Sequence, residues 1–117
     1  MIRLSDTWLL LAEAQMKLGK LTEAATSINV VRNRANATPV MAAQVTMDYI
    51  LDERGRELFG EEYRRFTLVR TGKFMDRVVR LNPAAGPNFQ PVNVLFPIPQ
   101  SAIDANTGAK LAQNPGY

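Results

Sequence analysis

Apolar residues recur every three or four positions through most of the chain, which is the spacing of an amphipathic α-helix. The first such segment covers residues 4–18 and the second covers residues 21–35, with Gly19 and Lys20 between them. A break this short predicts an antiparallel helical hairpin. The residues expected on the buried faces are Leu4, Trp8, Leu11, Ala12, Gln15 and Leu18, followed by Leu21, Ala24, Ala25, Ile28, Val31 and Ala35.

The spacing of this hairpin, residues 1–35, resembles a tetratricopeptide repeat. Small residues at Ala12 and Ala24 would let the two helices approach closely. Gln15 replaces a usual aromatic residue and Asn36 replaces a common Pro, so an ordinary amphipathic hairpin stays open as the alternative. The packing residues that the resemblance predicts are Trp8, Leu11, Ala12, Ala24 and Ile28.

Further helices are predicted over residues 46–81, after a loop that contains Pro39. Thr46 is the expected N-cap of the third helix. The helical spacing continues beyond it and predicts a stripe of core residues, with a new break at Thr71 and Gly72 before the last helix. The residues of that stripe are Leu58, Phe59, Tyr63, Phe66 and Val69.

The composition changes at the C-terminal end, where six of the seven prolines lie at or beyond residue 83. Proline lacks an N–H donor and restricts the residue before it, so residues 82–117 are predicted to form extended segments and turns. Apolar residues such as Val94 and Phe96 indicate that this tail packs on the helices. The predicted fold is therefore all-α, a single domain with a Pro-rich irregular tail.

Composition narrows the chemistry that the chain can perform. It contains 117 residues, 46% of them hydrophobic, and neither cysteine nor histidine. Disulfides, thiol nucleophiles and zinc sites built from Cys or His are therefore excluded, and we expect no metal, no cofactor and no catalytic residue. No apolar run reaches the roughly twenty residues of a membrane span, and we read no export signal or lipobox in the sequence.

The stretch from Glu53 to Lys73 is the most densely charged part of the chain, with four acids and six bases in twenty-one residues. Acids and bases alternate in it, which is unlike the one-sign patch of a nucleic-acid surface. Glu61 and Glu62 are neighbours that would point about 100° apart on a helix, so they do not form an acid/base pair.

Three charged residues of this stretch lie close to its apolar stripe. We hypothesise that the Glu57 carboxylate and an arginine, Arg64 or Arg70, form a partly buried brace between the third helix and the turn that follows. Three solvated charges are the alternative. Trp8 is expected in the core rather than as a sugar-stacking surface, and roles for Tyr49 and Tyr117 remain open.

Several segments, in this order, resemble the C-terminal region of the SusD/RagB family. They are Arg3-Leu4-Ser5-Asp6 with Ala12-Glu13-Ala14, Ile28-Asn29-Val30-Val31-Arg32-Asn33-Arg34-Ala35, Glu53-Arg54 with Glu57-Leu58, Tyr63-Arg64-Arg65-Phe66-Thr67-Leu68-Val69-Arg70, Leu95-Phe96-Pro97-Ile98-Pro99-Gln100 and Gln113-Asn114-Pro115-Gly116-Tyr117. Three positions depart from residues that are common in that family: Glu62 stands in place of a Gly, Arg65 in place of a Trp and Thr67 in place of an Asp. The resemblance spans nearly the whole chain.

This resemblance implies an all-α fold with tetratricopeptide-like helix pairs. It also implies an outer-membrane surface lipoprotein that captures glycans or other nutrients for a SusC-like TonB-dependent transporter, with a lipid anchor outside this sequence. We expect a C-terminal fragment, with the ligand bound mainly by an earlier region, and no ligand residue can be assigned by position. The alternative is a stand-alone tetratricopeptide-like module for protein–protein interaction.

Overall fold

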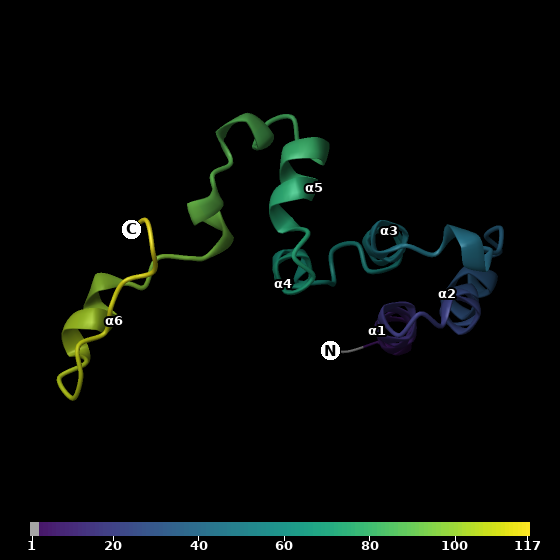
Figure 1. The fold of residues 1–117 in the computed structure, drawn as a ribbon, viewed down its shortest axis with the longest axis horizontal. Helices are drawn as coiled ribbons and strands as arrows, with labels where there is room; N and C mark the ends of the chain where they lie inside the picture. The colour runs from purple at the N-terminus through teal and green to yellow at the C-terminus, as the bar shows by residue number, and fades with distance from the viewer. Residues whose placement is uncertain (1–2) are drawn as a thin grey trace. The chain divides into compact units, whose positions relative to one another are not determined.

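The computed structural model describes residues 3–117, and that range contains helices and their connections without any β-strand (Figure 1). The predicted all-α fold is therefore confirmed. Contacts along the chain gather in two compact units, which we call unit 1 (Met1–Arg64) and unit 2 (Arg65–Tyr117). The prediction of a single domain stays a prediction.

The elements are α1 (Leu4–Lys17), α2 (Leu21–Arg34), η1 (Ala42–Gln44), α3 (Met47–Glu57), α4 (Arg64–Arg70), α5 (Phe74–Leu81), η2 (Gly86–Asn88), η3 (Pro91–Val94) and α6 (Gln100–Ala105), where η marks a 3-10 helix.

The predicted hairpin is formed by α1 and α2, and its turn is closed by backbone hydrogen bonds. Gly19, with a φ of +75°, occupies the left-handed region that glycine enters without strain. Its N–H donates to the Met16 carbonyl at 3.0 Å, and the Lys20 N–H donates to the Gln15 carbonyl at 2.9 Å. These are the two bonds of a Schellman C-cap, which stops α1 and reverses the chain.

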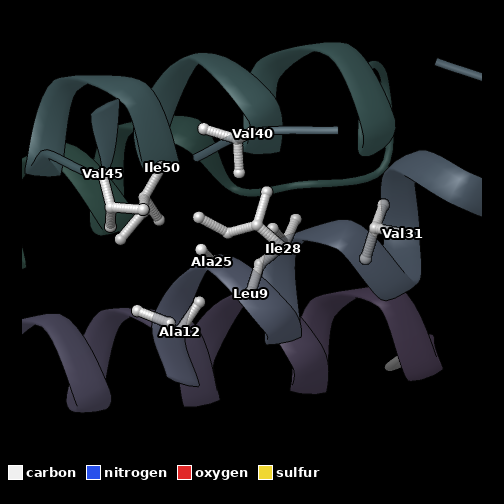
Figure 2. Packing of buried hydrophobic residues seen from close by; sticks show 9 residues of the cluster. Leu9, Ala12, Ala25, Ile28, Val31, Val40, Val45 and Ile50 are labelled. Carbon is white, nitrogen blue, oxygen red and sulfur yellow. The ribbon is translucent and has the colours of Figure 1, made fainter. Parts of the chain in front are cut away.

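The hydrophobic core of unit 1 lies between α1, α2 and the segment that leads into α3. Figure 2 shows side chains from these three parts pointing toward one another, with Ile28 at the centre. Asn29 fixes the connecting segment, because its side chain both donates to and accepts from the backbone of Val40, at 3.0 and 2.8 Å. The core residues are Leu9, Ala12, Ala24, Ala25, Ile28, Val31, Val40, Val45 and Ile50.

The buried face of α1 differs from the predicted one by a shift in register. The residues buried on it are Ser5, Leu9, Ala12 and Glu13. Leu11, predicted to pack in the hairpin, is 42% exposed, and Leu4 and Leu18 are each 73% exposed. Of the other residues given by the repeat-like pattern, Ala12, Ala24 and Ile28 are fully buried, and Trp8 is half-buried against the core.

The α3 helix begins as predicted and ends earlier than the apolar spacing indicated. The Thr46 side chain accepts a hydrogen bond from the Tyr49 N–H at 3.1 Å, so Thr46 is the N-cap. After Glu57 the chain turns, and this turn resets the helical register before α4. The predicted core stripe is therefore wrong in part: Leu58 is buried, whereas Phe59, Tyr63 and Phe66 are 88%, 79% and 66% exposed.

Unit 2 consists of α4, α5 and the tail, and the tail packs on α5 as predicted. Phe74 of α5 meets Phe89 edge to face, with ring centroids 5.0 Å apart. Gly86 is buried against the end of α5, where a Cβ would lie 2.8 Å from the Val79 carbonyl oxygen. Only glycine permits this approach, which brings η2 and η3 against the helix.

The tail closes on itself through side chains that bind backbone groups. The Gln113 amide both donates to and accepts from the backbone of Ile98, at 2.8 and 2.7 Å. Asn114 donates to the Phe96 carbonyl at 2.7 Å. The Tyr117 hydroxyl lies 3.0 Å from the Leu95 carbonyl oxygen, which ties the last residue back to η3. The terminal motif thus stabilises the extended segments that proline prevents from forming regular helices.

Candidate functional site

The charged stretch begins on α3, and its most buried base is Arg54. The Arg54 side chain is 5% exposed. Its Nη2 donates to an Asp6 oxygen on α1 at 2.6 Å, and its Nε donates to a Glu62 oxygen at 2.5 Å. A buried guanidinium is tolerated only where carboxylates replace its hydration, so these two bonds join α1, α3 and the turn after α3.

Glu57 makes a second connection of this kind, with partners other than those predicted. One of its oxygens accepts from Arg3 at 2.8 Å and from Arg34 at 2.6 Å. The hypothesised brace from Glu57 to Arg64 or Arg70 stays a prediction, and Arg64 donates to Glu62 at 3.2 Å. The Glu57 carboxylate therefore joins the end of α3 to the start of α1 and to the end of α2.

Glu53 completes the charged face of α3. Its carboxylate accepts from Arg32 of α2 and from Arg56, both at 2.6 Å. The same two guanidinium groups lie over the Tyr49 ring, 5.8 and 5.9 Å from its centroid. Tyr49 is therefore a cation–π partner of two arginines within unit 1.

The carboxylates of this stretch are placed for ion pairing. Glu61 binds Arg3 at 2.6 Å, whereas its neighbour Glu62 binds Arg54 and Arg64. Residues 3–117 contain no group of three or more acids that could hold a metal ion. No helix in the same range is both long and apolar enough to cross a membrane. The four carboxylates of the charged stretch are therefore all engaged in ion pairs.

Arg65 connects three parts of unit 2 through one side chain. Its guanidinium carbon lies 4.6 Å from the Phe74 ring centroid and 3.9 Å from that of Phe96. Its Nη2 also donates to the carbonyls of Asn93 and Val94, at 2.6 and 3.1 Å. Arginine can stack and donate in its plane at once, so one side chain holds α4, α5 and the tail together.

Two hollows on unit 1 could admit another molecule. The first is an open groove of about 240 Å³ between α1 and α2, where Trp8 lies with Val30 and Val31, and Arg3 and Arg34 stand beside them. The second is a pocket of about 260 Å³ at the end of α3, beside Phe59 and Arg64. Both are lined mainly by apolar groups, and each has charged side chains at its edge, Arg3 and Arg34 in the first and Glu62 and Arg64 in the second.

The sequence did not single out Arg54 or Arg65 for these contacts, and it predicted Phe59 as a core residue. Arg54 could have been found, because it lies four residues from both Ile50 and Leu58, which are buried on the same face. Arg65 and Phe59 gave no such signal. Their roles depend on a stacking partner remote in sequence and on a turn that the helical spacing did not predict.

Comparison with known proteins places the chain in a family. The model of the SusD family matches residues 1–117. The chain belongs to the SusD family. The SusD-like protein P25 of Formosa agariphila is 35% identical over 113 residues, covering 89% of this chain and 21% of the relative.

A second relative is the starch-binding protein SusD of Bacteroides thetaiotaomicron. It is 33% identical over 121 residues, which cover 100% of this chain and 21% of the relative. This member of the SusD family therefore spans about a fifth of the length of either relative. No solved structure matches it.

Proposed function

We propose that this SusD-family chain is part of a cell-surface protein that binds a glycan or another nutrient and delivers it to a SusC-like TonB-dependent transporter of the outer membrane. The observation that supports this proposal most strongly is the family match over the full 117 residues, together with a relative named as starch-binding. The role is binding rather than catalysis. This agrees with carboxylates that are engaged in ion pairs.

The contacts within unit 1 suggest what this region contributes to such a protein. Carboxylates at Glu53, Glu57 and Glu62 fix the helices to one another without forming a reactive centre. A rigid helical region of this kind can present a surface to a ligand or to a transporter. Attachment to the membrane would come through a lipid anchor, as in our expectation for the family.

Affinity electrophoresis through gels that contain a polysaccharide tests the binding role. We expect the purified chain to migrate more slowly in gels that contain starch or another bacterial or plant glycan than in gels without it. Bovine serum albumin run beside it controls for sieving. Equal migration in every gel would contradict glycan binding by this chain.

Delivery to a transporter is tested separately, by co-expression with a SusC-like TonB-dependent transporter. We expect the two proteins to co-purify in detergent.

The groove between α1 and α2, lined by Trp8, Val30 and Val31, supports a second candidate function, a tetratricopeptide-like module that binds other proteins. Co-purification of a partner that is not a transporter, without any retardation by glycans, would favour that alternative.

A further inference from the structure

The pocket at the C-terminal end of α3 has features that the proposed function does not by itself assign. Its lining residues are Gly55, Leu58, Phe59, Gly60, Glu62 and Arg64, and its volume is about 260 Å³. Pockets for drug-sized ligands measure about 300–1,000 Å³, so this one suits a single small ring. We propose that it binds one neutral pyranose ring of a glycan, stacked on Phe59 and hydrogen-bonded by Arg64; this inference rests on the proposed function.

The Phe59 ring provides the apolar surface for such a ligand. It is 88% exposed, while its neighbour Leu58 points inward and is 4% exposed. Gly60, with a φ of +75°, turns the chain immediately after the ring. The C–H face of a pyranose is apolar and flat, and it stacks on an aromatic face as other apolar groups do.

Arg64 provides the hydrogen-bond donors. Its Nη2, Cζ and Nη1 atoms lie 3.7, 3.8 and 4.0 Å from the place that a Cβ on Gly55 would take. These nearly equal distances mean that the guanidinium plane faces Gly55 broadside, where a larger residue would displace it. Its Nη1 donates one hydrogen bond to Glu62 at 3.2 Å, and the group has five N–H donors in all. The other donors can reach adjacent hydroxyl oxygens of a sugar.

The charges around the pocket favour a neutral ligand. Glu62 accepts from both Arg54 and Arg64, and Arg54 also binds Asp6. This series of ion pairs has two acids and two bases, so its formal charge is zero. An anionic ligand would meet the Glu62 carboxylate beside Arg64, whereas sugar hydroxyls can accept from the guanidinium without bringing a charge.

Titration of the ¹⁵N-labelled chain with maltohexaose, a starch oligosaccharide, tests this assignment by NMR. We expect saturable shifts of the Gly55 and Gly60 amides. Phe59→Ala should weaken binding about fivefold, the range of an aromatic contact, and Phe59→Trp should restore it. Arg64→Ala should weaken binding to a similar extent. Circular dichroism should give the same melting temperature for wild type and Phe59→Ala, because the ring is exposed.

Matched controls are an apolar and a basic residue elsewhere on unit 1. Leu18→Ala removes a side chain from a residue that is 73% exposed, and Arg56→Ala removes a surface guanidinium from α3. Both should leave the affinity within about twofold of wild type. Shifts that depend on protein concentration without sugar, and that Phe59→Ala abolishes, would mean that a second copy occupies the pocket and would overturn the proposal.

Failure of this site can be separated from failure of the proposed function. If the chain is retarded by starch gels but Gly55 and Gly60 do not shift, or Phe59→Ala binds as tightly as wild type, the site is wrong and glycan binding stands. If the gels do not retard the chain and the sugar shifts no amide resonance, both the proposed site and glycan binding by this chain are wrong. Shifts at the two glycines that weaken in Phe59→Ala and Arg64→Ala support both.

Discussion

Unit 1 and unit 2 are stabilised by different kinds of contact. Unit 1 has one continuous core in which Leu9, Ile28 and Ile50 are fully buried. In unit 2 the buried apolar side chains among the described residues are Leu68 and Phe74. Besides the contact between the Phe74 and Phe89 rings, it has hydrogen bonds from side chains such as Arg65 and Gln113 to backbone carbonyls. The same chain thus uses an apolar core in one unit and backbone-directed polar contacts in the other.

This difference predicts unequal resistance to local opening. Burying a large aliphatic side chain contributes about 1.5–3 kcal/mol, whereas a typical hydrogen bond contributes about 0.5–1.5 kcal/mol net. Unit 2 should therefore open at a lower free energy than unit 1, a difference that amide hydrogen exchange measures directly. The four substitutions below test this contrast in order of decreasing effect.

Arg54→Ala should have the largest effect, about 4 kcal/mol off the free energy of unfolding of unit 1. The substitution leaves the Asp6 and Glu62 carboxylates without the guanidinium that replaced their hydration. Urea unfolding followed by Trp8 fluorescence measures the loss. Arg56→Ala is the control, because its side chain is 56% exposed and should contribute only about 0.5 kcal/mol. Equal losses from the two variants would mean that the burial of Arg54 is unimportant.

Ile28→Ala should come next, with a loss of about 3 kcal/mol in unit 1. Ile28 is fully buried at the centre of the core, and the smaller side chain would leave a cavity there (Figure 2). Val30→Ala on the same helix is the matched control, since Val30 is 41% exposed. Denaturant titration should separate the two by at least about 2 kcal/mol. A loss below about 1 kcal/mol for Ile28→Ala would contradict an apolar core as the main support of unit 1.

The hairpin was predictable from the sequence, but the face of α1 that is buried was not. Gly19 falls where the apolar period breaks, and this local signal is enough to place the turn. Leu11 fits the helical stripe, yet it is exposed while Ser5 and Glu13 are buried. Which of two adjacent stripes faces the core depends on how the helices cross, and that angle is not encoded in the spacing of one helix.

The ion pairs of the charged stretch were likewise only partly predictable from the sequence. Alternating charge indicated ion pairing, which the structure confirms, but it did not identify the partners. Glu57 binds Arg3, which lies 54 residues away, and Arg34, which lies 23 residues away. Neighbours in sequence, such as Arg64, were the only candidates that helical spacing could offer. The long-range pairs depend on the packing of three helices, so they become visible only in the folded chain.

Arg65→Lys should lower the stability of unit 2 by about 2 kcal/mol. Lysine keeps the charge but loses the planar group that stacks between Phe74 and Phe96 while donating to Asn93. We expect faster hydrogen exchange at the Lys73 amide, whose N–H donates to the Leu68 carbonyl in the C-cap of α4. Arg80→Lys, on an exposed side chain, is the control. Unchanged exchange at Lys73 in Arg65→Lys would show that Arg65 does not hold unit 2 together.

Tyr117→Phe should have the smallest effect, about 1 kcal/mol, because it removes a single hydroxyl. That hydroxyl lies 3.0 and 3.2 Å from the carbonyl oxygens of Leu95 and Val92. Exchange should quicken at the Leu95 amide and stay unchanged in α1 and α2. Tyr49→Phe is the matched control, since Tyr49 interacts through its ring with Arg32. If Tyr117→Phe instead quickened exchange throughout unit 1, the two units would share one cooperative transition, and the contrast between a core-supported and a polar-supported unit would fail.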